Sequence, residues 1–200
     1  MTIVSSFLTF PCTSWWAQAQ KADTIVFDSA EYFQKMSYRN RYRVAGANNS
    51  ILLSLPLVNG RNQRTPMASV DIYNQGRWQT QHWRSLVSVY NRSPFFGHYE
   101  LGLKPLFETQ YSRLVDFNMQ TILWAKRQLK LGFEIQETDV YIKQYPPDIT
   151  DLRNIKDANC HIPAYHQVFE DRIGFLPGLS ILDLLFSEGP AAASLLEKTK

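Results

Sequence analysis

The sequence predicts an α/β fold: a mixed sheet with an N-terminal βαβ unit, a basic β-hairpin and flanking helices. Three observations support this prediction. Two short apolar runs enclose a helical segment near the N-terminus, two strand-like segments flank a Gly-Ala-Asn-Asn turn, and amphipathic stripes recur in the second half. We expect one domain over residues 1–190 and a frayed tail over residues 191–200.

The N-terminal segment has the pattern of a parallel βαβ unit. Residues 2–10 are rich in β-branched and aromatic side chains, and Pro11 ends this predicted strand. Ser14 is placed to cap a short helix, and residues 24–27 form a second apolar run. Because ligands of parallel sheets bind beyond the carboxyl ends of the strands, we expect a ligand crevice at that edge.

The next segment, residues 31–43, concentrates positive charge. It holds one lysine and three arginines against a single glutamate, so it carries as much net charge as the whole chain, +3. We expect strands over residues 38–45 and 50–58, joined by the Gly-Ala-Asn-Asn turn. Three like charges on one face of the first strand require an acid or an anionic ligand nearby. These residues are Arg39, Arg41 and Arg43.

The residue types in this segment suit an anionic ligand that carries a ring. A guanidinium fork matches phosphate or carboxylate oxygens, lysine adds a point charge, and tyrosine rings offer flat faces to a sugar or a base. We predict ligand contacts from Tyr32, Lys35, Tyr38, Arg39, Asn40 and Arg41 and, from later segments, Arg84, Tyr165 and Gln167. The alternative is an ordinary amphipathic strand whose arginines are solvated or paired with carboxylates.

The second half of the sequence is predicted to be mainly helical. Residues 78–90 carry the i, i+3, i+4, i+7 stripe of an amphipathic helix, and a second helix is expected from Ser112 to a left-handed cap at Gly132. Residues 145–165 contain two adjacent prolines and little apolar periodicity, so we expect a loop or lid there. A C-terminal helix is expected to start at Ser180.

Two residues are candidates for catalysis. His82 could act as a general base because it lies among tryptophans on an amphipathic helix, and Asp183 could orient a base or bind a hydroxyl group. Each has a structural alternative: His82 as a histidine at the edge of the core, and Asp183 as part of a capping box with Ser180. Tyr165 and Gln167 could likewise face the crevice or pack within an ordinary strand.

Several classes of function are disfavoured by composition. A net charge of +3 without a basic stripe does not favour nucleic-acid binding. The two cysteines, Cys12 and Cys160, match no metal-binding spacing, and no cofactor motif is present, so we predict neither a metal nor a cofactor. No apolar run is long enough to span a membrane and the first residues lack a leader pattern, so we expect a cytoplasmic protein with reduced thiols.

Three blocks of the sequence resemble the WbqC-like protein family. They are Tyr32-x-x-Lys35-x-Ser37-Tyr38-Arg39-Asn40-Arg41, Trp78-x-x-x-His82-Trp83-Arg84-Ser85-x-x-x-x-Tyr90 and Phe175-x-Pro177-x-Leu179-Ser180-Ile181-Leu182-Asp183-Leu184-Leu185-Phe186. The chain departs from the family at two places. Many members have a Gln-Pro-x-Tyr-x-Pro motif after the first strand, and of this motif only Pro11 is present here. Many members also have a further strand and a glycine-rich turn where this chain has the predicted loop of residues 145–165.

The resemblance implies a role in surface-polysaccharide biosynthesis of the O-antigen type. Members of the family are similar in being encoded with polysaccharide genes, and one proposed role is transfer of an acyl or aminoacyl group to an amino sugar. The expected partner is therefore a small anionic sugar or nucleotide-sugar, with His82 accepting a proton from the amine. A non-catalytic binding or assembly protein of such a pathway, oligomeric or not, stays open as the alternative.

Overall fold

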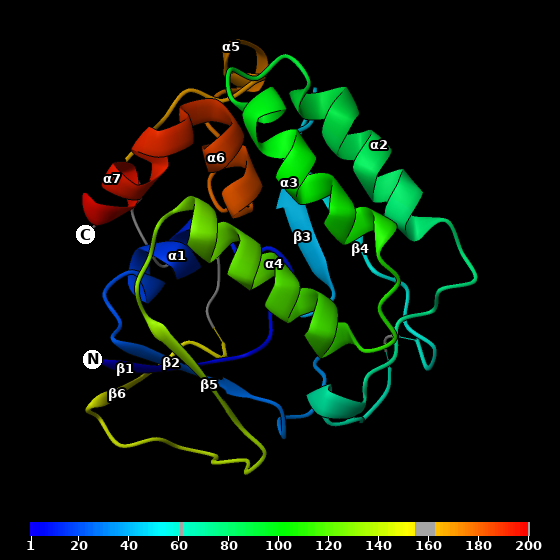
Figure 1. Ribbon diagram of the computed structural model, residues 1–200, viewed down its shortest axis with the longest axis vertical. Helices are drawn as coiled ribbons and strands as arrows, with labels where there is room; N and C mark the ends of the chain where they lie inside the picture. The colour runs from blue at the N-terminus through cyan, green and yellow to red at the C-terminus, as the bar shows by residue number, and fades with distance from the viewer. Residues whose placement is uncertain (61, 155–162, 200) are drawn as a thin grey trace.

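A four-stranded parallel sheet forms one side of the molecule in this computed structural model, which describes residues 1–60, 62–154 and 163–199. The strand order is β5-β2-β1-β6, and every neighbouring pair is parallel. The strands are β1 (Thr2–Ser5), β2 (Thr24–Asp28), β5 (Glu134–Thr138) and β6 (Ile149–Asp151). Figure 1 shows these strands together at the end of the molecule that holds the N-terminus.

The predicted βαβ unit is confirmed, with shorter elements than the sequence suggested. Strand β1 ends at Ser5, and residues 6–10 leave the sheet toward a left-handed turn at Phe10 (φ 40°). Helix α1 (Thr13–Ala19) crosses from β1 to the parallel strand β2. Its N-cap is Cys12, so the prediction that Ser14 caps this helix is wrong; Ser14 lies inside the first turn.

The predicted basic hairpin consists of β3 (Arg41–Val44) and β4 (Ile51–Ser54), which pair in antiparallel fashion as a separate sheet. Gly46 follows β3, where a Cβ atom would lie 2.4 Å from a backbone oxygen of the turn, so only glycine fits. The expectation that three arginines share one strand face is wrong for Arg39, because β3 begins only at Arg41. Arg39 instead lies in the irregular segment that leads into the hairpin.

The helices cover the remainder of the molecule, as Figure 1 shows. They are α2 (Trp78–Tyr90), α3 (Phe96–Glu108), α4 (Leu114–Gln128), α5 (Glu170–Ile173), α6 (Ile181–Glu188) and α7 (Ala192–Glu197), with 3-10 turns at Met67–Ser69 and Gly189–Ala191. Helix α4 ends before the predicted position, because Lys130 rather than Gly132 takes the left-handed conformation (φ 56°).

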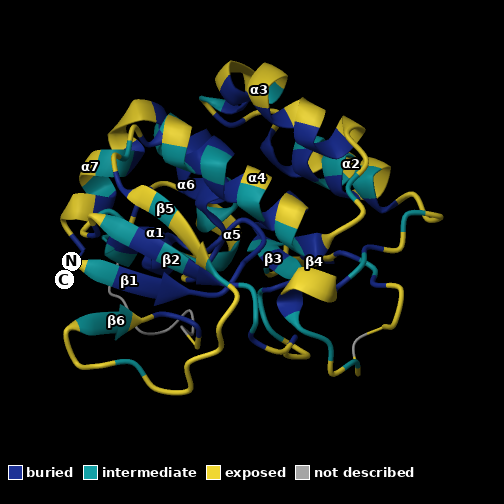
Figure 2. Cartoon of the chain, turned by 60° about the horizontal axis from the view of Figure 1, so that its bottom comes forward, coloured by how far each residue is buried: buried dark blue, intermediate teal, exposed yellow. Residues whose placement is uncertain are grey.

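Two segments that were expected to be irregular contain regular structure. Strand β6 lies within the predicted loop of residues 145–165 and pairs with β1, while residues 155–162 of that loop lie outside the described part. The tail of residues 191–200, expected to fray, contains α7, and Leu196 of this helix is fully buried. Figure 2 shows that α7 presents its buried side to the body of the protein.

Aromatic side chains dominate the core between the sheet and the helices. Trp15 and Trp16 of α1 are fully buried. The ring of Phe10 has its centroid 5.0 Å from that of Tyr42 and 6.2 Å from that of Phe117, which joins the β1 loop to the hairpin and to α4. None of the helices in the described residues is long and apolar enough to cross a membrane.

Candidate functional site

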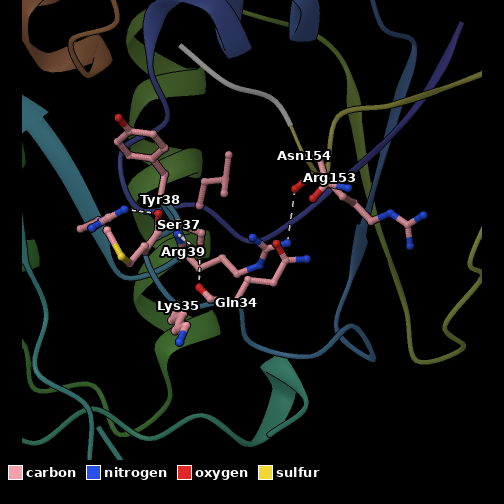
Figure 3. A pocket seen from close by; sticks show the side chains of 10 residues that line it. Gln34, Lys35, Ser37, Tyr38, Arg39, Arg153 and Asn154 are labelled. Atoms are coloured by element: carbon pink, nitrogen blue, oxygen red, sulfur yellow. Dashed lines mark hydrogen bonds between the residues drawn. The ribbon is translucent and has the colours of Figure 1, made fainter. Parts of the chain in front are cut away.

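A pocket of about 390 Å³ lies where the order of the parallel strands reverses. The chain passes from β1 outward through β2 to β5, and then returns to the other side of β1 as β6. The crevice beyond the carboxyl ends of two such strands is the usual ligand site of open parallel sheets. This pocket is lined by Leu8, which follows β1, by Arg153 and Asn154, which follow β6, and by residues between Gln34 and Arg41 (Figure 3).

Arg39, which lines the pocket, forms a buried ion pair with Glu31, which lines a smaller adjoining hollow instead. Arg39 is 2% exposed, and its Nε and Nη2 donate to the two carboxylate oxygens of Glu31 at 3.0 and 2.7 Å. Nη2 also donates to Ser6 Oγ at 2.7 Å and to the Arg153 carbonyl at 3.3 Å. Arg39 thus reaches the predicted pocket, but an internal carboxylate already neutralises it.

Arg153 forms a second buried pair next to the first, and sequence reasoning missed it. Its Nη1 donates to Asp28 at 2.9 Å, and its Nε and Nη2 donate to Asp151 at 3.0 and 2.7 Å. Burial opposes ionisation of Asp151, but the hydrogen bonds from Arg153 outweigh this effect and lower the pKa of Asp151. The hydrogen bonds to Asp151 are also the main reason that the pKa of Arg153 is raised.

We call these residues, Ser6, Asp28, Glu31, Arg39, Asp151 and Arg153, the switch-point network. Asp28 ends β2 and Asp151 ends β6, so the signal that could have found the network is an acid at the carboxyl end of each strand. In Figure 3 the Arg153 side chain extends away from Arg39, while the Arg153 carbonyl accepts from the Arg39 guanidinium. The two pairs are therefore joined through backbone and Ser6.

Two cations at the pocket have no carboxylate partner among the described residues: Lys35 and Arg41. The Arg41 Nη2 donates to the carbonyl of Met36, and its guanidinium lies 5.9 Å from the centroid of the Tyr38 ring. The Arg41 Nε is buried without a hydrogen-bond partner in the described part of the chain. Lys35 is exposed, and Figure 3 shows it extending away from Tyr38.

The turn that carries these groups has an unusual backbone. Met36 adopts a left-handed conformation (φ 59°) although it is not glycine. The turn is held by Arg41, which binds the Met36 carbonyl, and by Ser37 Oγ, which donates to the Gln34 carbonyl at 2.6 Å. Strained turns of this kind cluster at ligand sites, where the surrounding structure maintains them.

Five of the predicted ligand contacts lie elsewhere than in this pocket: Tyr32, Asn40, Arg84, and also Tyr165 and Gln167, which lie beside Asp183. The Asn40 side chain donates to the Leu55 carbonyl at 2.9 Å and so extends the hairpin pairing. Arg84 is exposed on α2 and does not line the pocket. Tyr32 is 59% exposed and lines a smaller adjoining hollow of about 220 Å³.

His82 lies in the core and does not line the pocket. It is 4% exposed, and its Nδ1 is 3.2 Å from the Tyr42 hydroxyl oxygen. Burial lowers the pKa of His82 to about 4, against the opposing effect of a hydrogen bond with the backbone of Ser54. These contacts match the structural alternative, a neutral histidine bonded within the core.

Asp183 lies in a closed cluster with Tyr90, Tyr165 and Gln167, which we call the Asp183 cluster. The two tyrosine hydroxyls each donate to its carboxylate at 2.7 Å, and Gln167 Nε2 donates at 3.1 Å. Asp183 is fully buried, and burial raises its pKa. Sequence reasoning grouped Asp183, Tyr165 and Gln167 as site residues; the structure does bring them together, but not at the pocket.

The predicted capping box of Ser180 and Asp183 is correct for Ser180 and wrong for Asp183. Ser180 is the N-cap of α6, and its Oγ accepts from the Leu182 amide at 3.3 Å. The Asp183 carboxylate does not fold back over this cap, because the Asp183 cluster uses both of its oxygens.

The described residues contain no group of three or more His, Cys, Asp or Glu arranged to hold a metal ion. Cys12 is a buried free cysteine, and Cys160 lies outside the described residues.

Comparison with known proteins gives one match. A family model, WbqC-like protein family, covers residues 8–156, which include the pocket-lining residues from Leu8 to Asn154. Neither the search of curated proteins nor the search of solved structures found a match. Because the matched region is well over half of the chain, this protein belongs to the WbqC-like protein family.

Proposed function

We propose that the protein binds a phosphorylated or nucleotide-linked sugar in this pocket and acts as a transferase of surface-polysaccharide assembly. The observation that carries the binding proposal is the charge of the lining. Among the described residues, four cationic side chains and no carboxylate line the pocket: Lys35, Arg39, Arg41 and Arg153. Arg39 and Arg153 are already paired with carboxylates, so an anion would meet Lys35 and Arg41 without having to displace one.

The four cations differ in how available they are to an anionic ligand. Arg39 and Arg153 each form an ion pair with a buried carboxylate, which holds their side chains in place in the lining. Arg41 keeps nitrogen atoms without a carboxylate partner among the described residues, and its guanidinium is fixed by the Met36 carbonyl and the Tyr38 ring. A fixed guanidinium can bind two phosphate oxygens at little further cost in side-chain entropy. Lys35 adds an exposed charge to the lining.

The transfer reaction in this proposal is movement of an acyl or aminoacyl group to the amine of an amino sugar. Its support is the family resemblance together with the cations, which could stabilise the oxyanion of a tetrahedral intermediate. His82 and Asp183 are buried away from the pocket. Their positions therefore do not support the roles expected from sequence, a general base for His82 and a group that orients a base or binds a hydroxyl for Asp183. The described lining therefore supports substrate binding and charge stabilisation more directly than proton transfer.

A specific observation also favours the second candidate, a non-catalytic binding protein of the same pathway. No histidine, cysteine or carboxylate lines the pocket of about 390 Å³ in the described residues, so a nucleophile or base is not evident there. A binding protein needs only the cations and the rings.

Isothermal titration of the wild-type protein with UDP-glucose, UDP-N-acetylglucosamine and dTDP-glucose tests the binding proposal. We expect at least one ligand to bind, and Arg41→Gln to weaken it on the order of tenfold, equivalent to about 1.4 kcal/mol. Arg92→Gln is the matched control, because Arg92 is exposed just beyond α2 and does not line the pocket. Absence of heat with all ligands, or equal binding by Arg41→Gln and wild type, would contradict the proposal.

Mass spectrometry of mixtures separates the two candidates. Wild-type protein with a bound amino-sugar nucleotide and a panel of activated acyl donors is expected to give an acylated sugar. Binding without product for every donor would favour the non-catalytic candidate.

A further inference from the structure

We infer that the adjoining hollow of about 220 Å³ is a separate subsite that takes the sugar ring, so that the ligand lies with its phosphate in the larger pocket and its ring in the smaller one. This inference rests on the proposed function and adds an orientation to it. The two hollows share Gln34, Arg153 and Asn154, so one ligand can occupy both.

The charge of the lining differs between the two hollows. In the described part of the chain, the larger pocket is lined by cations and no carboxylate, whereas the smaller one is lined by two acids and two bases: Glu31, Asp151, Lys143 and Arg153. A phosphate group is therefore favoured in the larger pocket. A neutral, hydroxyl-bearing group suits the smaller one, because it gains hydrogen bonds there without meeting a like charge.

Two exposed tyrosines border the smaller hollow. Tyr32 is 59% exposed and Tyr141 is 52% exposed, so both rings have surface open to a ligand in this hollow. Tyr141 is held in place by Arg153, whose guanidinium carbon lies 5.5 Å from the ring centroid and whose Nη1 donates to the next carbonyl, that of Ile142. A ring fixed in this way can stack on a sugar with little loss of side-chain freedom.

Polar groups without internal partners lie between the two tyrosines and the larger pocket. The side-chain amides of Gln34 and Asn154 make no hydrogen bond to another described residue, and both residues are exposed. The Asp151 side chain is 33% exposed, so its carboxylate can accept further hydrogen bonds besides those from Arg153. Amides that donate and accept, beside a carboxylate that accepts, match the hydroxyl groups of a pyranose.

Titration with inorganic phosphate and with hexose 1-phosphates tests this orientation, because these ligands differ only by the ring. The probes are glucose 1-phosphate, galactose 1-phosphate and N-acetylglucosamine 1-phosphate. We expect wild-type protein to bind at least one of them on the order of tenfold more tightly than phosphate, equivalent to about 1.4 kcal/mol. Tyr141→Ala is expected to abolish this preference while leaving the affinity for phosphate unchanged.

Controls keep the two proposals distinguishable. Tyr73→Ala removes a tyrosine of similar exposure, 43%, that lines neither hollow, and it should retain the preference. Arg41→Gln should weaken phosphate and hexose 1-phosphate equally. If Tyr141→Ala keeps the wild-type preference, or if wild type binds every hexose 1-phosphate no better than phosphate, the ring subsite is overturned and the anion pocket stands. If wild type binds neither kind of ligand, both proposals fail.

Discussion

Two of the buried polar regions of this protein, the switch-point network and the Asp183 cluster, differ in whether their charged groups border open space. In the switch-point network the ion pairs are covered on one side by the strands, and Arg39, Arg153 and Glu31 line hollows on the other. In the Asp183 cluster three donors converge on one carboxylate, and no member lines any of the described hollows around the turn at Gln34. Of these two regions, the switch-point network is therefore the one whose buried charges border a hollow that a ligand could enter.

The largest expected effect comes from breaking the Arg39–Glu31 pair. Glu31→Ala would leave the buried guanidinium without its carboxylate, and removal of one partner of a buried pair typically costs about 3–5 kcal/mol. Urea unfolding followed by circular dichroism measures this loss. The double variant Glu31→Leu/Arg39→Met, which removes both charges, should recover much of the stability; a double variant as unstable as Glu31→Ala would show that the pair has another role.

A somewhat smaller effect is expected from protonation of His82. Its pKa is about 4 in the folded protein against 6.5 for an ordinary histidine, so its contribution to stability is present above pH 6.5 and is lost as the pH falls toward 4. The wild type should lose about 3 kcal/mol of unfolding free energy over this range beyond what His82→Gln loses. Parallel pH profiles for the two proteins would mean that His82 is accessible to water, and would restore it as a candidate base.

The smallest of the three effects concerns Asp183. Asp183→Asn places an amide against hydroxyl and amide donors, and we expect a loss of about 2 kcal/mol, whereas exposed Asp171→Asn should change little. Burial raises the pKa of Asp183, so its contribution to stability is complete below pH 4 and falls as the pH rises through the folded pKa. The difference between wild type and variant, measured by thermal unfolding from pH 3 to pH 7, should therefore shrink with rising pH.

The fold class was predictable because apolar periodicity and turn residues report local structure directly. Strand β6 was not, because three residues are too few to show a pattern, and only pairing with β1 makes them a strand. The switch-point network could not be predicted for a similar reason. Arg153 and Asp28 are 125 residues apart in sequence, and the pairing of the strands brings them together.

The candidate site was predictable in part. Lys35, Tyr38, Arg39 and Arg41 do line one pocket, since they belong to one short segment whose composition was unusual. Sequence could not reveal that Glu31 neutralises Arg39, because the pairing depends on the course of the backbone between β2 and β3. The structure places His82 and Asp183 in the core. Sequence could not show this, because a titratable residue on an apolar helix face has the same pattern whether it meets substrate or other side chains.

The separation of β1 and β6 along the chain has a consequence for when the candidate pocket forms during folding. Contacts between the start of the chain and a segment so far along it are slow to form, because a long loop must close before they are made. The hairpin and α2 need no such closure and can fold earlier. A nascent or partly folded chain would thus hold much of its native structure before the candidate pocket is complete. Any ligand of that pocket would then stabilise only the fully folded chain.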